Sequence, residues 1–300
     1  MSYCCIMMDI TSGCNLRCKF CVQDWKCVKE NFNTSKETFK KIVEIIPLAH
    51  DEWFFFSCAF ESTIHPQFFE LFESIPKEMK PKIFFTTNLA KKFTVEQIER
   101  ISKLNISIIN ISFESFNPSI YEELRSGAKY INFINNLENL VKAFRKNKNA
   151  PQIRYISMLF KQNLYEVEAI VKTCNEKYSA SSNEFRTPFP WTLSYNDTEW
   201  LNKSMITLDE YNELAERIEK LPYNIKLYNP SIINQPQTFN FIVNLNFFIN
   251  SNGSLMFLAR NEENFPEELK NLNINNMNDP YNYLKNIFDR VLEEQNDSIK

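Results

Sequence analysis

Short hydrophobic runs alternate with longer segments of helical period over the first 190 residues. The runs have the length of buried strands, and they cover 5–10, 53–58, 82–87, 106–113, 153–160 and, more weakly, 183–187. Between them, apolar residues recur every three or four positions, which is typical of amphipathic helices. These segments are 34–50, 67–75, 94–104, 118–125, 135–146 and 164–178. Strands that are apolar throughout indicate a parallel sheet with both faces covered.

Six strand–helix units predict an α/β fold of the partial-barrel type. A complete eight-unit TIM barrel typically needs about 250 residues, so a partial (β/α)6 TIM-like barrel fits better. We place this barrel at residues 1–192. In such folds ligands bind at the carboxyl ends of the strands, and loops that follow strands are therefore the places to search for chemistry.

The pattern changes beyond about residue 190, after Pro188 and Pro190. An amphipathic helix is predicted at 207–220. Two strand-like runs, 241–249 and 254–259, flank the turn sequence Asn-Ser-Asn-Gly, which favours a β-hairpin, and a last helix is expected at 281–294. Residues 193–300 are therefore predicted to form a small α+β extension.

Composition and charge argue against several classes of protein. The chain has 300 residues, 44% hydrophobic and 24% charged, with a net charge of -3. This charge gives no general attraction to nucleic acid or anionic lipid, and no apolar run approaches the roughly 20 residues of a membrane helix. Eight cysteines without a signal peptide indicate reduced thiols and metal ligands rather than disulfides. We expect a cytoplasmic protein.

The segment 14–21 carries the strongest chemical signal. Cys14, Cys18 and Cys21 follow the first predicted strand at a spacing that lets all three thiols face inward from one loop. Thiolates bind zinc and iron–sulfur clusters, but a structural zinc or an ordinary cubane cluster takes four protein ligands. Three ligands leave one metal position open. The alternatives are a zinc loop completed by another residue, Cys27 or His50, or unrelated thiols.

This spacing, with Phe20 as the aromatic residue before the last cysteine, resembles the signature of the radical S-adenosylmethionine (radical SAM) superfamily. The resemblance implies an enzyme in which Cys14, Cys18 and Cys21 hold three irons of one [4Fe-4S] cluster and SAM chelates the fourth. It also implies reductive cleavage of SAM to a 5'-deoxyadenosyl radical, which takes a hydrogen atom from the substrate. The cofactor supplies this chemistry, and the protein supplies orientation and exclusion of water.

Ala59, Phe60 and Glu61 follow the second predicted strand and resemble the Gly-Gly-Glu-Pro segment that binds the SAM amino group in the family. Glu61 matches the acidic position, and a carboxylate suits an ammonium ion. Both glycines and the proline are absent from a chain that has only 3 glycines in all. A plain loop carboxylate is the alternative for Glu61.

Further SAM contacts are implied after the third and fourth strands. Ser112 and Arg125 match a serine and an arginine that hold the SAM carboxylate and ribose in related enzymes. Asn88 ends a Thr-Thr-Asn segment and faces either the cofactor or substrate, or a turn of its own.

Two thiols are candidates for returning a hydrogen atom to a substrate radical, as in radical epimerases. Cys58 ends the second strand, and Cys27 lies six residues beyond the cluster loop. Arg154, Tyr155 and Arg186 lie on late strands, but alternation alone does not decide which of them face the barrel interior.

The hairpin and last helix resemble the carboxyl-terminal extension of the SPASM or twitch group of radical SAM enzymes. No cysteine follows Cys174, so we expect an extension without an auxiliary cluster. A covering hairpin unrelated to that group is the alternative.

The habits of this group favour peptide modification, by epimerisation or crosslinking, with flavodoxin or ferredoxin as the electron donor. Only 13 residues precede the cysteine loop, so a peptide substrate would need a separate recognition protein or the extension. One alternative is a dehydrogenase or epimerase of a sugar or small polar metabolite. Another is a non-catalytic metal-binding protein.

Overall fold

The strands within the described residues form one nine-stranded sheet at the centre of the fold, in the order β7-β6-β5-β4-β3-β2-β1-β8-β9. The computed structural model describes residues 3–28, 30–188, 198–229, 245–257 and 267–298. Neighbouring strands are parallel throughout, except that β9 is antiparallel to β8. The strands are β1 (Cys4–Met8), β2 (Ala49–Phe56), β3 (Ile83–Thr87), β4 (Ile108–Ser112), β5 (Gln152–Met158), β6 (Ala180–Arg186), β7 (Ile225–Tyr228), β8 (Phe247–Ile249) and β9 (Leu255–Phe257).

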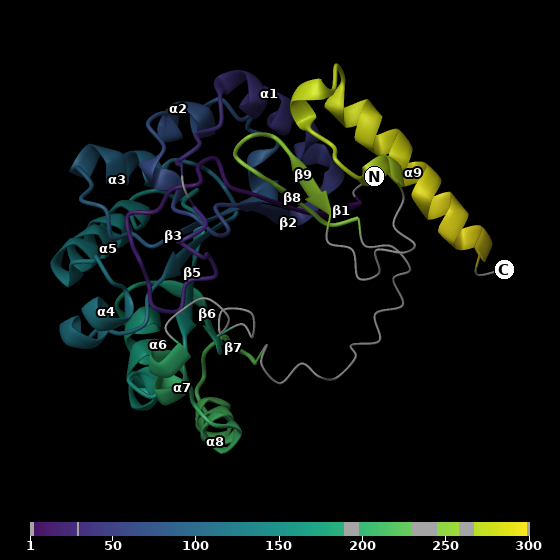
Figure 1. Cartoon of the computed structure of the whole chain (residues 1–300). Helices are drawn as coiled ribbons and strands as arrows, with labels where there is room; N and C mark the ends of the chain where they lie inside the picture. The colour runs from purple at the N-terminus through teal and green to yellow at the C-terminus, as the bar shows by residue number, and fades with distance from the viewer. Residues whose placement is uncertain (1–2, 29, 189–197, 230–244, 258–266, 299–300) are drawn as a thin grey trace.

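Helices cover the outer side of this curved sheet (Figure 1). They are α1 (Lys36–Ile45), α2 (Phe68–Glu73), α3 (Val95–Ser102), α4 (Pro118–Leu124), α5 (Tyr130–Phe144), α6 (Val167–Glu176), α7 (Thr198–Ser204), α8 (Leu208–Ile218) and α9 (Pro280–Ser298). Local sequence explains where several begin. Ser35 caps α1, and Thr94 with Gln97 forms a capping box at α3, as Thr207 with Glu210 does at α8.

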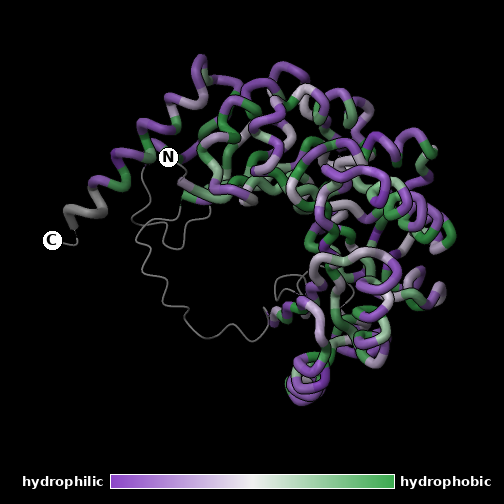
Figure 2. The backbone as a smooth tube through the Cα atoms, turned by 180° about the vertical axis from the view of Figure 1, so that it is seen from behind, coloured by the Kyte–Doolittle hydropathy of each residue, from purple (hydrophilic) through white to green (hydrophobic). Residues whose placement is uncertain are grey.

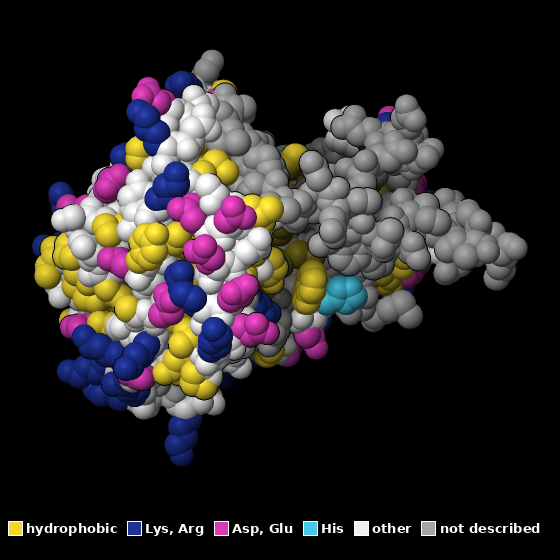
Figure 3. Space-filling model, turned by 90° about the horizontal axis from the view of Figure 1, so that it is seen from below, with side chains coloured by type: hydrophobic (Ala, Val, Ile, Leu, Met, Phe, Trp, Pro, Cys, Tyr) yellow, Lys and Arg dark blue, Asp and Glu magenta, His cyan; other side chains and the backbone are white. Residues whose placement is uncertain are grey.

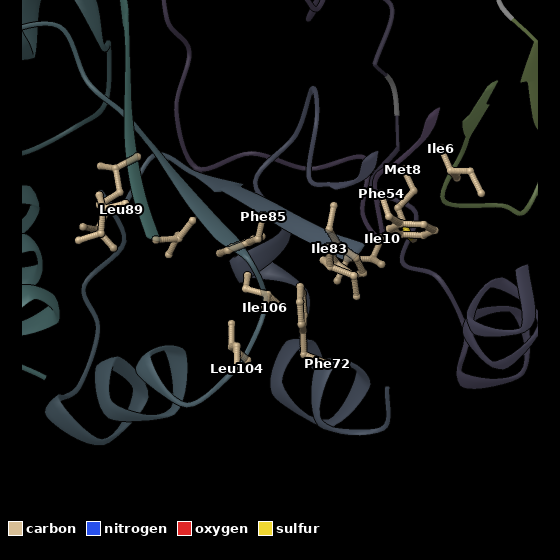
Figure 4. Packing of buried hydrophobic residues seen from close by; sticks show 14 of the residues in the cluster. Ile6, Met8, Ile10, Phe54, Phe72, Ile83, Phe85, Leu89, Leu104 and Ile106 are labelled. Carbon is tan, nitrogen blue, oxygen red and sulfur yellow. The ribbon is translucent and has the colours of Figure 1, made fainter. Parts of the chain in front are cut away.

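The core lies between the outer face of the sheet and the helices. In Figure 4, side chains from β3 and α2 meet in this layer, and the rings of Phe72 and Phe85 are 5.5 Å apart, centroid to centroid. Ile83 and Phe85 are fully buried. Burying a large apolar side chain contributes about 1.5–3 kcal/mol to stability, so the apolar face of each strand packs against the helices. Because side chains alternate along a strand, the opposite face is turned away from the helices.

That opposite, inner face carries polar residues on the middle strands. Thr86, Asn110, Arg154 and Ser182 are successive neighbours in register across β3, β4, β5 and β6. Tyr155, by contrast, is 1% exposed and donates its hydroxyl to the carbonyl of Tyr178 in the core. The facing that strand alternation left open is thus resolved, with Arg154 inward and Tyr155 outward.

The predicted partial (β/α)6 barrel is confirmed, and each predicted strand overlaps an observed one. The pattern missed β7, a four-residue strand that lies beyond the prolines taken as the end of the barrel. The predicted hairpin is present as β8 and β9, and its turn includes Gly253 at a φ of 85°. Its expected ends at 241–244 and 258–259, and the proposed domain boundary at 192, lie outside the described residues.

The hairpin continues the barrel sheet, because β8 pairs in parallel with β1. The outer helices show alternating hydrophilic and hydrophobic stretches when the molecule is seen from behind (Figure 2). On the face seen from below, acidic and basic side chains are intermingled over most of the described surface (Figure 3). None of the described helices is long and apolar enough to cross a membrane.

Candidate functional site

The three loop cysteines line one cavity at the carboxyl ends of the parallel strands. The cavity has a volume of about 210 Å³, and Cys14, Cys18 and Cys21 form one wall. The ends of the other strands form most of the rest, together with Arg125 after α4. These contribute Cys58 to Glu61 after β2, Thr86 to Asn88 at β3, Ser112 and Glu114 at β4, Ile156 and Met158 on β5, and Arg186 on β6. The topology thus brings the predicted loop to the edge where ligands of parallel α/β folds bind.

Backbone hydrogen bonds hold the loop at both ends. The carbonyl of Gly13 accepts the N–H of Glu61 at 3.0 Å, and the N–H of Arg17 donates to the carbonyl of Ser126 at 2.8 Å. Gly127, at a φ of 93°, allows the chain after α4 to approach the loop, where a Cβ on it would lie 3.6 Å from the carbonyl oxygen of Asn15. The loop is therefore positioned by two separate segments.

Phe20 anchors the last turn of the loop by packing. Its ring is 7% exposed and lies 5.1 Å from the ring of Phe160, in a small cluster with Leu124 and Leu201. It also lines the cavity. The aromatic position of the motif thus supports the thiols from behind.

Hydrogen bonds reach two of the thiol sulfurs. The backbone N–H of Leu16 donates to Sγ of Cys14, and that of Gln23 donates to Sγ of Cys21, both at 3.4 Å. The side-chain amide of Asn88 adds a longer contact of 3.7 Å to Cys14. Burial raises the pKa of Cys14 to about 12, although the Leu16 N–H opposes it. A bound metal would reverse this preference, because coordination favours the thiolate.

Glu61 is buried, and it connects the loop after β2 to the end of β3. Its Oε1 accepts the hydroxyls of Thr63 at 2.6 Å and Thr87 at 2.9 Å. Its Oε2 accepts the N–H of Asn88 at 2.7 Å. Burial raises the pKa of Glu61, and these donors oppose the rise. The carboxylate therefore positions two lining segments and also faces the cavity.

Asn88 forms a turn of its own and also lines the cavity. Its Oδ1 accepts the N–H of Ala90 at 2.9 Å, which forms a local turn, while its Nδ2 faces Cys14 and donates to Asn15 at 3.0 Å.

Arg125 forms a buried bidentate ion pair with Glu114. Its Nε donates to one carboxylate oxygen and its Nη2 to the other, the latter at 2.9 Å. Both side chains line the cavity. Burial raises the pKa of Glu114, and the Arg125 charge opposes that rise. Burial also raises the pKa of Cys18, and the same cation opposes that rise.

The two candidate hydrogen donors differ in place. Cys58 is exposed and lines the cavity, whereas Cys27 is exposed outside the lining and contacts Asp24 at 3.2 Å. His50 lies at the start of β2, the end of the strand away from the loop. Neither Cys27 nor His50 thus joins the three thiols. Among the described residues, no three His, Cys, Asp or Glu side chains are grouped to hold a single metal ion.

Residues 8–174, which include the cysteine loop and the strands β2 to β5, match the family model described as the Radical SAM superfamily. The chain belongs to the radical SAM superfamily. It is therefore an enzyme of a family that uses a [4Fe-4S] cluster and SAM. Comparison with curated proteins gave no match.

Solved structures support the same radical SAM fold. Streptococcus suis SuiB bound to S-adenosylmethionine is 15% identical, with a TM-score of 0.61, over 85% of this chain and 60% of SuiB. SuiB bound to the precursor peptide SuiA is 16% identical, with a TM-score of 0.61, over 94% of this chain and 66% of that SuiB chain. HydG, a maturase of the [FeFe]-hydrogenase, is 11% identical, with a TM-score of 0.51, over 74% of this chain and 51% of HydG. The chain thus spans about 60% of the length of SuiB.

The cysteine loop fits the radical SAM cluster. The loop contributes three thiols, which match a cluster with one iron open to another ligand, and the fourth cysteine of the lining, Cys58, follows β2 and lies outside this loop. The N–H groups that reach Cys14 and Cys21 are the kind of outer contact that tunes such clusters. Cys14, Cys18 and Cys21 would hold the cluster, which supplies the electron for SAM cleavage when bound.

Sequence reasoning missed two residues of this radical SAM site. Asp9, just after β1, is 1% exposed and accepts the N–H groups of Cys58, Ala59 and Phe60. The second is Glu114, which forms the buried ion pair with Arg125. The available signal for Asp9 was a single carboxylate inside an apolar run from residue 4 to residue 10.

Proposed function

We propose that this chain cleaves SAM reductively and abstracts a hydrogen atom from a peptide, which it modifies by epimerisation or crosslinking. The main support is that Cys14, Cys18 and Cys21 line one cavity together with the residues predicted to contact SAM. Likeness of the fold to SuiB, one of whose structures contains its precursor peptide, supports the peptide as substrate.

The lining residues suggest how SAM would be held. Glu61 offers a buried carboxylate beside the loop 58–60 for the amino group. The Phe60 carbonyl already accepts the hydroxyl of Ser57 at 2.7 Å, which leaves the Ala59 carbonyl as the more open backbone acceptor of the pair. Arg125 would contact the SAM carboxylate with the guanidinium N–H groups that Glu114 does not use, and Ser112 lies in the same wall.

Cys58 is the better placed of the two proposed hydrogen donors, because it alone of the pair lines the cavity. A thiol there would be able to return a hydrogen atom to a substrate radical, and this supports epimerisation over crosslinking. Flavodoxin or ferredoxin is the proposed reductant, in a cytoplasmic setting that keeps the thiols reduced. The carboxyl-terminal region is proposed as a twitch-like extension without an auxiliary cluster, since no cysteine follows Cys174.

The test is anaerobic iron and sulfide analysis, with electron paramagnetic resonance of the reduced protein before and after SAM. We expect about four irons per chain, a spectrum that shifts on adding SAM, and formation of 5'-deoxyadenosine with dithionite. Zinc in place of iron, or a cluster indifferent to SAM, would contradict the proposal and favour a non-catalytic metal-binding protein.

Matched cysteine variants sharpen this test. Cys18→Ala removes a proposed ligand, and Cys27→Ala removes an exposed thiol outside the cavity. Iron should fall to below about one per chain in the first and stay at the wild-type level in the second. Equal iron content in both variants would show that this loop does not bind the cluster.

A further inference from the structure

A row of polar side chains crosses the inner face of the sheet one layer below the cavity. Thr86, Asn110 and Arg154 are register neighbours on β3, β4 and β5, and the side-chain amide of Asn110 donates to the Thr86 hydroxyl at 3.0 Å. Thr86 itself lines the cavity. Ile156, two residues beyond Arg154 on the same face of β5, also lines it. The row is therefore continuous with the cavity floor.

Two buried polar atoms in this row have no hydrogen-bond partner. They are Oδ1 of Asn110, in a side chain that is 2% exposed, and Nε of Arg154. An unsatisfied buried donor or acceptor costs about 1–3 kcal/mol, which is why such atoms are rare and call for an explanation. Here an acceptor and a donor stand unpaired on adjacent strands at the same register.

Arg154 also differs in its charge balance from the two arginines that line the cavity, Arg125 and Arg186. Arg125 is paired with Glu114, and Arg186 with Glu184. Within the described residues, no carboxylate pairs with Arg154. The guanidinium carbon of Arg154 lies over the ring of Phe84, 5.6 Å from the centroid of that ring. An aromatic face holds the cation in place without neutralising it.

We propose that Asn110 and Arg154 form a subsite for a substrate carboxylate that has a hydrogen-bond donor beside it. The planar guanidinium suits a carboxylate, and the Asn110 oxygen would accept an adjacent N–H. A peptide presents this chemistry in two ways, at its terminal carboxylate or at an acidic side chain. This inference rests on the proposed peptide-modifying function, because it assigns the group by which that substrate is held.

The subsite also sets a direction for the substrate. Residues two apart on a strand are about 6.6 Å apart, so a carboxylate at Arg154 lies roughly one residue length below the cavity lined by Ile156. Atoms adjoining the carboxylate would then enter the space beside the cysteine loop. Arg154 is thus a positioning residue, and it makes no contact with the thiols.

The test measures binding of small probes by saturation-transfer NMR on the anaerobically purified full chain. The probes are N-acetylglycine, which mimics a peptide carboxyl terminus, and N-acetylaspartate α-methylamide, which mimics an acidic side chain. The uncharged control is N-acetylglycinamide. We expect one carboxylate probe to bind and the control to bind at least about tenfold more weakly, as expected for loss of a charge-assisted hydrogen bond. Which probe binds identifies the source of the carboxylate.

Two variants test the residues separately. Arg154→Met removes the cation, and Asn110→Asp places a carboxylate in register with Arg154 that would occupy it internally. Either should weaken probe binding at least about tenfold. Arg145→Met, at an exposed arginine outside the barrel, is the matched control and should bind like wild type. Near-ultraviolet circular dichroism checks that each variant is folded.

Binding unchanged in both folded variants, equal binding of the uncharged control, or no binding of either carboxylate probe would overturn the subsite. The NMR measurement requires neither the cluster nor SAM cleavage. A chain that fails to form 5'-deoxyadenosine yet binds the probe through Arg154 would contradict the proposed function only. A chain that cleaves SAM but binds neither carboxylate probe would contradict only the proposed carboxylate subsite.

Discussion

The carboxyl group of Asp9 accepts a hydrogen bond of 3.0 Å from the backbone N–H of Ala59, and so joins the end of β1 to the loop that follows β2. The N–H groups of Cys58 and Phe60 reach the same carboxyl group at 2.9 and 3.3 Å. This is the segment in which Ala59 and Phe60 stand where related motifs have glycines. One side chain from the neighbouring strand therefore holds the conformation of a loop without glycine.

Replacing Asp9 with alanine should loosen this loop. Three partly buried N–H groups would lose their acceptor, and we expect the free energy of unfolding to fall by about 3 kcal/mol, measured by urea denaturation. SAM affinity, measured by equilibrium dialysis on the reconstituted protein, should fall at least about tenfold because the loop forms part of the SAM wall. Asp51→Asn, at an exposed ion pair with Lys82, is the control. Equal effects of both variants would contradict the role of Asp9.

The stability that depends on Asp9 should vary with pH in an unusual direction. Burial raises the pKa of Asp9 to about 7, from an ordinary value of 3.8, with Glu61 adding to the rise and the three N–H donors opposing it. Between these values the folded chain holds a proton that the unfolded chain has lost. The contribution of Asp9 to the free energy of unfolding should therefore be fully present below about pH 4 and be lost as the pH rises through 7.

The variant Asp9→Asn isolates this contribution, because asparagine does not titrate. Urea denaturation at a series of pH values should show wild type losing stability relative to the variant between about pH 4 and 8, by on the order of 4 kcal/mol. Glu61 and Cys58 also face Asp9, and both remain in the variant, so their titration is common to the two proteins. A constant difference across this range would show that Asp9 titrates normally.

The fold was predictable where the signal is local. Hydrophobic runs located the strands of the barrel, and Thr94 and Thr207 marked helix starts through short-range capping. β7 was missed because four residues of alternating pattern, 225–228, carry little information. Its place in the sheet depends on pairing with β6, which no short window contains.

The site was predictable in the same measure. The spacing of Cys14, Cys18 and Cys21 lies within eight residues, so it indicated a metal site directly. The contact of Asp9 with Ala59 joins positions 50 residues apart, and it arises only once β1 and β2 pair. The local spacing of the cysteines therefore indicated the chemistry. The contacts that support the site could be found only once the pairing of the strands was known.

The buried pair Arg125 and Glu114 should tune the reduction potential of the cluster in opposite directions. Burial raises the pKa of Cys18, and the Arg125 charge opposes that rise, so the guanidinium is close enough to act on the proposed ligands. Reduction adds negative charge to the cluster, so Arg125→Met should make the potential more negative, on the order of 50 mV, and Glu114→Gln should make it more positive. A redox titration followed by electron paramagnetic resonance measures both.

The opposite signs make this prediction sharp. A merely disturbed loop would shift the potential in one direction in both variants, and that result would contradict the electrostatic role. Glu114→Gln leaves a buried guanidinium without its partner, at a cost of about 3–5 kcal/mol, so its folding is checked by circular dichroism before titration. Arg145→Met, at an arginine outside the cavity, should leave the potential unchanged.

Gly127 should matter for cluster loading although it is not a ligand. Its φ of 93° strains any other residue, and it lies against the cysteine loop near the carbonyl of Asn15. Gly127→Ala should cost about 1–3 kcal/mol and lower the iron content per folded chain. Gly253→Ala is the matched control, because Gly253 also has a positive φ, 85°, an added Cβ would lie 2.7 Å from Nδ2 of Asn275, and the hairpin turn that contains it does not line the cavity. We expect the second variant to lose at least as much stability in denaturation and to keep its full iron content. Parallel loss of iron in both variants would mean that loading follows overall stability and not the position of the loop.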